Sequence, residues 1–85
     1  MNITLRYFAA LREAVGLGQE QLSLPPEVHT VGAVRELLRA RGGAWAEALA
    51  LEKAVRMACN QVMCGADTPV VDGGEIAFFP PVTGG

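Results

Sequence analysis

The sequence has few of the residues on which many enzymes depend. Its 85 residues include one histidine, two cysteines, one tryptophan and one tyrosine. Cys59 and Cys64 lie five positions apart, a spacing that fits neither a CxxC pair nor a disulfide framework. No apolar run approaches the ~20 residues needed to cross a membrane, and no basic leader precedes the first segment. We therefore expect a cytoplasmic protein with reduced thiols, no metal site, no bound cofactor and no membrane contact.

Positive charge is absent from the last third of the sequence. The net charge is -2, and all seven basic residues lie between Arg6 and Arg56. Asp67, Asp72 and Glu75 follow them without a compensating cation. Because nucleic-acid-binding surfaces need clustered lysine and arginine, a nucleic-acid partner is not expected.

The composition predicts one small globular domain. Apolar residues make up 51% of the sequence and charged residues 19%, which suits a packed core and not a disordered chain. A domain this small cannot both build a core and enclose a deep catalytic pocket. Function is therefore expected on a surface or at a chain end, and we find no catalytic set of serine, histidine and aspartate and no phosphate-binding loop.

Hydrophobic periodicity predicts alternating strands and helices. Strands are expected at 2–8, 19–24, 54–60 and 75–79, with brief pairing at 69–71, and helices at 9–15, 31–41 and 44–51. The remaining segment, 61–68, is expected to be a loop. In the long helix Thr30 is the predicted N-cap, and three side chains are expected to face solvent: Arg35, Glu36 and Arg39.

This order of elements predicts a two-layer α+β domain. One mixed sheet is expected, with the long helix packed across it and short additional helices beside it. The domain is expected to cover residues 1–79. An extended C-terminal tail follows at 80–85.

The tail combines stiffness at its base with freedom at its tip. It consists of Pro80, Pro81, Val82, Thr83, Gly84 and Gly85. The two prolines favour an extended segment, and a carboxylate carried on two glycines could enter a channel too narrow for any side chain. Such a carboxylate suits adenylation by ATP and capture by a nucleophile. An amine would make the protein a modifier, whereas sulfide or persulfide would make it a sulfur donor.

The same residues carry a specific resemblance. The end of the sequence from Asp72, DGGEIAFFPPVTGG, resembles the C-terminal signature of the small subunits of molybdopterin synthase, which are ubiquitin-like β-grasp sulfur carriers. The segment FAALRE at 8–13 and the Asn60-Gln61 pair resemble other parts of these subunits. Two positions depart from the pattern. Gly74 replaces an expected acidic residue, and Cys59 replaces a usual aliphatic one.

The resemblance implies a carrier that is not catalytic on its own. An E1-like activating enzyme would use ATP to adenylate Gly85, and a sulfurtransferase would supply the sulfur of a C-terminal thiocarboxylate. The large subunit of a heterotetrameric synthase would then receive the tail, and sulfur would pass to cyclic pyranopterin monophosphate to form the molybdopterin dithiolene. Alternatives are a carrier for thiamine or another metabolite, a modifier joined to lysines, and a passive binding module in which the Gly-Gly end is irrelevant.

Two phenylalanines lie out of phase with the predicted core. Phe8 and Phe79 fall on the polar phase of their strands, whereas Ile76 and Phe78 fall on the apolar phase. The pair predicts an exposed apolar patch that binds a partner. The resemblance adds Met63 to this patch. Alternatively, twist or a bulge at the strand ends resets the alternation, and the two side chains form no patch. Sulfur carriage by the thiol of Cys64 is a further alternative, although nothing nearby in the sequence would lower its pKa.

Overall fold

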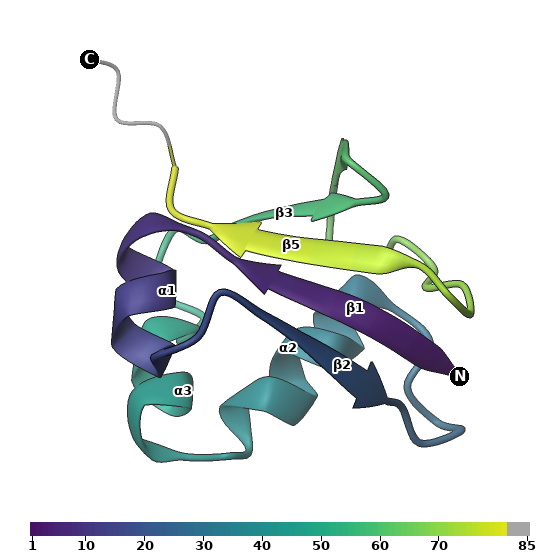
Figure 1. The fold of residues 1–85 in the computed structure, drawn as a ribbon, viewed down its shortest axis with the longest axis horizontal. Coiled ribbons are helices and arrows are strands. Elements are labelled where there is room, and N and C mark those ends of the chain that lie inside the picture. Colours follow the sequence, from purple (N-terminus) through teal and green to yellow (C-terminus); the bar gives the residue numbers. More distant parts are fainter. Residues whose placement is uncertain (82–85) are drawn as a thin grey trace.

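The computed structural model describes residues 1–81, which form one five-stranded mixed sheet with three helices on one of its faces (Figure 1). The strands are β1 (Asn2–Tyr7), β2 (Gln19–Ser23), β3 (Arg56–Cys59), β4 (Val62–Cys64) and β5 (Glu75–Phe79). The helices are α1 (Ala9–Val15), α2 (Val31–Arg39) and α3 (Gly43–Ala48). The strand order is β2-β1-β5-β3-β4, in which β1 and β5 pair in parallel and the other neighbours pair antiparallel. This is the expected β-grasp, ubiquitin-like architecture.

The core lies between the sheet and α2. Val31, Val34 and Leu38 of the helix are fully buried against Leu5 and Ile76 of the two central strands. Thr30 caps α2 as predicted, because its side-chain oxygen accepts a hydrogen bond from the backbone N–H of Ala33 at 3.1 Å. The predicted phase of β5 is confirmed, since Ile76 and Phe78 are 1% and 0% exposed.

Tight turns set the register of the central strands. Gly73 has φ 80, which favours glycine, and its N–H donates to the carbonyl oxygen of Asn2 at 2.7 Å. Gly74 is buried, and a Cβ there would approach the Val71 carbonyl oxygen to 2.9 Å. Glycine at position 74, where the resemblance leads us to expect an acidic residue, therefore fits this turn because it has no Cβ.

The prediction that Arg35 faces solvent is wrong. Its side chain is 8% exposed and reaches the segment after α3. It donates hydrogen bonds to the carbonyl oxygens of Leu49 at 2.9 Å, Ala50 at 2.7 Å and Lys53 at 3.4 Å. The Leu49 carbonyl lies at the C-terminus of α3, where carbonyls lack intrahelical donors, and the Arg35 side chain supplies one. Burial lowers the pKa of Arg35, and the nearby charge of Arg39 lowers it further.

The predicted loop at 61–68 is also wrong in part, because Val62–Cys64 forms the edge strand β4. Asn60 and Gln61 both have positive φ, 49 and 69, and join β3 to β4 as a two-residue turn. A strand of three apolar residues shows no alternation, which is why periodicity missed it. The asparagine in the turn was the available signal.

Candidate functional site

The candidate site is the base of the C-terminal tail, where the central strand β5 ends. Phe79 closes the strand, and Pro80 and Pro81 follow it outside any strand, both half-buried. Figure 1 shows that this end of β5 lies beside α1. The predicted reactive end, formed by Val82, Thr83, Gly84 and Gly85, lies outside the described residues.

The structure brings Phe8 and Phe79 together at this base. Their ring centroids lie 6.5 Å apart at an interplanar angle of 83°, an edge-to-face contact. The guanidinium carbon of Arg6 lies 5.4 Å from the centroid of the Phe8 ring. Phe8 is 41% exposed, as predicted, whereas Phe79 is half-buried. The aromatic pair thus lies on the sheet face opposite the helices, next to the first residue of the tail.

Met63 lies on the same face, on the edge strand β4, two strands away from Phe79. Residues directly opposite each other in neighbouring strands share a face, and the pairing places Arg6 beside Ala77, Ala77 beside Ala58, and Ala58 beside Met63. Both alanines are 8% exposed, and Met63 is 53% exposed. Ala58 and Ala77, both largely covered, therefore lie between Met63 and strand β1. Neither alanine was predicted as part of the site, although Ala58 alternates with Met57 and Cys59 in the predicted strand at 54–60.

The two cysteines are free and half-buried on neighbouring strands. Cys59 pairs with Val62 and Cys64 with Met57, so the two thiols are diagonal neighbours on the helix-covered face. Cys59 packs against the core, as predicted. Burial raises the pKa of the Cys64 thiol above its ordinary value, which disfavours the reactive thiolate.

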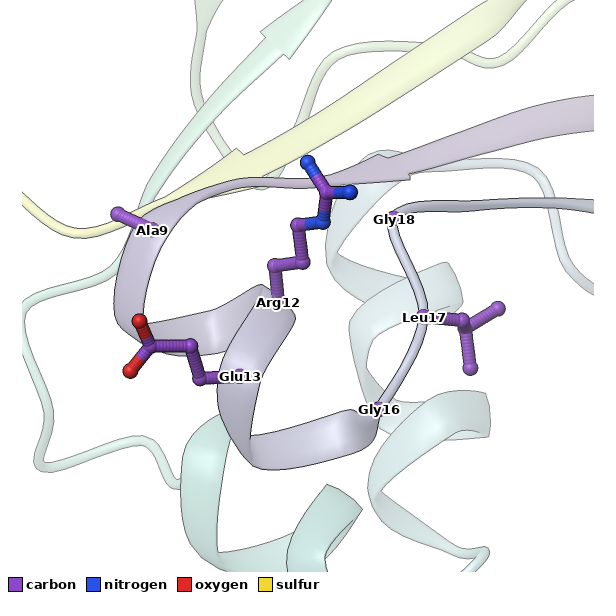
Figure 2. A pocket seen from close by; sticks show the side chains of 6 residues that line it. All are labelled: Ala9, Arg12, Glu13, Gly16, Leu17 and Gly18. Atoms are coloured by element: carbon purple, nitrogen blue, oxygen red, sulfur yellow. The ribbon is translucent and has the colours of Figure 1, made fainter.

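A hollow of about 520 Å³ lies beside α1, lined by Ala9, Arg12, Glu13, Gly16, Leu17 and Gly18 (Figure 2). Figure 2 shows Arg12 extending toward Gly18, Glu13 pointing the other way and Leu17 pointing away from both; Leu17 packs against the core. A Cβ at Gly18 would approach the Arg12 Nε to 3.0 Å, so the arginine packs on this glycine. A small-molecule site requires polar groups that converge on one point, and the polar groups of this hollow do not converge.

No metal-binding cluster of histidine, cysteine and carboxylate residues exists within residues 1–81. In the same part of the chain, no helix is long and apolar enough to span a bilayer. The described part of the candidate site is the tail base and the sheet face that carries Phe8, Phe79 and Met63.

Fold and site together define a β-grasp protein that presents an apolar sheet face beside the start of its C-terminal segment. The chain belongs to the ThiS family, whose model matches residues 5–85. The resemblance found in the sequence is therefore confirmed at the level of the family.

Two curated relatives match almost the whole chain. The molybdopterin synthase sulfur carrier subunit of Haemophilus influenzae is 43% identical over 98% of this chain and 99% of its own length. The subunit of the same name from Escherichia coli is 42% identical with the same coverage.

Solved structures share the fold over the whole domain. The putative molybdopterin converting factor subunit 1 of Pyrococcus furiosus is 26% identical over 96% of this chain and 99% of that one, with a TM-score of 0.78. A complex of subunits 1 and 2 of the molybdopterin-converting factor from Helicobacter pylori contains a chain that is 23% identical over 100% of both chains, with a TM-score of 0.68. The latter comparison bears on the fold alone.

Proposed function

We propose that the protein is the sulfur-carrying small subunit of a molybdopterin synthase. One observation carries this proposal: identity of 42–43% over 98% of the chain to two carriers of that name. The protein is not catalytic itself, and its partner would supply the active site. We further propose that it acts in the cytoplasm, within a heterotetrameric synthase.

The proposed chemistry takes place at the carboxylate of Gly85. An E1-like enzyme would catalyse attack of this carboxylate on the α-phosphorus of ATP, which forms an acyl adenylate and releases pyrophosphate. A persulfide on a sulfurtransferase would then displace AMP, and reduction of the resulting acyl disulfide by a thiol would leave the thiocarboxylate. Inside the large subunit, the thiocarboxylate would give its sulfur to cyclic pyranopterin monophosphate.

The described part of the chain supports a carrier role. Its tail base follows directly from the central strand β5, which is paired on both sides, so the start of the tail has a fixed position. Phe8, Phe79 and Met63 provide an apolar surface beside that base, which suits docking on a larger protein. In this proposal the folded domain binds the partner, and the tail carries the reacting atom.

Deletion of Gly85 and addition of one residue after it test the proposal. Both changes should abolish sulfur transfer in a reconstituted pterin sulfuration assay and leave thermal unfolding nearly unchanged. The intact mass of protein isolated from its own cell should show exchange of one C-terminal oxygen for sulfur. Full activity of the extended protein would contradict the carrier role.

A second candidate is a protein modifier. The small archaeal modifier protein 1 of Methanosarcina acetivorans shares the fold, with 25% identity and a TM-score of 0.77. A modifier would appear in cells as a ladder of conjugates joined through Gly85 to lysine side chains. Free carrier bearing a thiocarboxylate, without such a ladder, would favour the sulfur-carrier role. A carrier for thiamine or another metabolite would show the same oxygen-to-sulfur exchange in the mass measurement. Only the pterin sulfuration assay would distinguish such a carrier from the subunit proposed above.

A further inference from the structure

A groove between α1 and α3 begins at the tail base, on the helix-covered side of the sheet. Its first hollow, of about 180 Å³, is walled by apolar side chains and by one lysine. The lining residues are Ala10, Leu11, Ala14, Ala48, Lys53, Ala54, Val55 and Pro80. A second hollow, of about 260 Å³, shares Ala14, Ala48 and Lys53 with the first and continues to Ala44 and Glu47. We call the two together the α1–α3 groove.

We propose that the α1–α3 groove is a second docking surface for the large subunit, which inserts an apolar side chain flanked by a carboxylate. This inference rests on the proposed function, because it requires a partner that encloses the tail. Three features of the groove support this role: the position of Pro80, the size of the first hollow and the charge of Lys53.

Pro80 places the groove next to the proposed sheet-face interface. It lines the first hollow and directly follows Phe79, whose ring contacts Phe8 on the opposite side of the sheet. The base of the tail therefore has the aromatic pair on one side and the groove on the other. A protein that encloses the base of the tail can therefore contact both surfaces.

The first hollow suits a side chain better than a free metabolite. Sites for small molecules typically enclose about 300–1,000 Å³ and contain convergent polar groups. The hollow beside Pro80 is smaller, and its walls are mainly aliphatic, with Leu11 and Val55 among them. One large apolar side chain would fill it.

The positive charge of Lys53 favours a partner with a carboxylate at this position. Its side chain is exposed at the groove, and none of the ion pairs found within residues 1–81 includes it. Its backbone is held in place, because its carbonyl oxygen accepts from Arg35 at 3.4 Å and its N–H donates to the Ala50 carbonyl at 3.0 Å. A cation whose backbone is held at the edge of an apolar hollow is complementary to a carboxylate next to an apolar anchor. Glu47 at the far end would repel a second carboxylate.

Binding titrations of the purified large subunit against full-length carrier variants test the inference. Ala14→Trp fills the groove and Lys53→Glu reverses its charge, and each should weaken binding by about tenfold or more, as expected for loss of an interface anchor. Lys53→Met should have a smaller effect, since it keeps most of the aliphatic stem. Ala40→Trp adds the same ring at an exposed position after α2 and should bind like the wild type. Denaturant melts of each variant identify any that fails to fold. If Ala14→Trp does not fold, the binding affinity of Lys53→Glu tests the inference instead.

The outcomes separate this inference from the proposed function. Wild-type affinity in Ala14→Trp and Lys53→Glu, together with weakened binding in Phe8→Ala, would overturn the groove and leave the carrier role intact. Failure of the wild-type carrier to bind any large subunit would overturn both. A free carrier that sediments as a dimer, and as a monomer after Ala14→Trp, would assign the groove to a second copy and overturn the inference.

Discussion

The guanidinium of Arg35 donates a hydrogen bond of 2.7 Å to the carbonyl oxygen of Ala50, and this contact joins the middle of α2 to the segment after α3. The same side chain also reaches the carbonyls of Leu49 and Lys53. The segment from 49 to 53 precedes β3 and carries Lys53 to the α1–α3 groove. A buried arginine thus shapes a surface near the tail without lying on it.

Arg35→Met is expected to lower the free energy of unfolding by about 1–3 kcal/mol, because it removes the donor to the Leu49 carbonyl oxygen, whereas the Ala50 and Lys53 carbonyls keep backbone donors. Arg35→Lys should lower it less, since an ammonium group can still reach one of the carbonyls. Denaturant unfolding measures both changes. Arg39→Met is the matched control, because Arg39 pairs with the exposed Glu36 at 2.6 Å, and a change above about 1 kcal/mol there is not expected. Equal losses at positions 35 and 39 would contradict the role of the buried hydrogen bonds.

Substitution of the three phenylalanines should separate packing from recognition. Phe78→Ala should cost about 3–5 kcal/mol of unfolding free energy, because its side chain is fully buried. Phe8→Ala should cost clearly less and should instead weaken binding to the large subunit by about tenfold or more. Phe79→Ala should do the same, with a larger loss of stability than Phe8→Ala because Phe79 is half-buried. Paired melts and binding titrations measure these effects. If Phe79→Ala unfolds the domain as severely as Phe78→Ala, the sheet face is not the interface.

The raised pKa of Tyr7, the single tyrosine, predicts that the free energy of unfolding falls at alkaline pH. Burial, and then the negative charge of Glu20, raise the pKa of Tyr7 above its ordinary value. Below pH ~10 the phenol is protonated in both folded and unfolded chains, and its contribution is fully present. Above that pH the unfolded chain ionises while the folded chain keeps its proton, so the free energy of unfolding falls. Melts of wild type and Tyr7→Phe across this range isolate the effect. Tyrosinate absorbance appearing near pH 10 in the folded protein would contradict it.

The cysteines are expected to be dispensable for sulfur loading. Cys64→Ser should keep full transfer activity, since burial already holds this thiol in its protonated form. Cys59→Val should also remain active and change stability by less than about 1.5 kcal/mol, because a small apolar side chain replaces another at the edge of the core. Intact mass and the transfer assay measure both variants. A folded Cys64→Ser protein that no longer loads sulfur would move the reacting atom from Gly85 to the thiol.

Local patterns in the sequence predicted most of the elements. The helix at 9–15 and the strand at 75–79 have the predicted bounds, because Gly16 ends the first and alternation followed by Pro80 defines the second. The outward phase of Phe8 was also predictable from alternation alone. The proposed reacting position, Gly85, was readable because it depends on chemistry at a chain end and not on packing.

Contacts between distant segments decided the rest. Periodicity along α2 assigned Arg35 to solvent, and no local pattern indicates that carbonyls near residue 50 would lie within its reach. The edge strand β4 exists because β3 offers it a pairing partner, and three residues are too few to show a period of two. The contact of Phe8 with Phe79 and the groove from Pro80 to Lys53 likewise depend on the parallel pairing of β1 with β5. The sequence alone thus determined most local elements and suggested the chemistry proposed for the tail, whereas long-range pairing determined which surfaces lie beside its base.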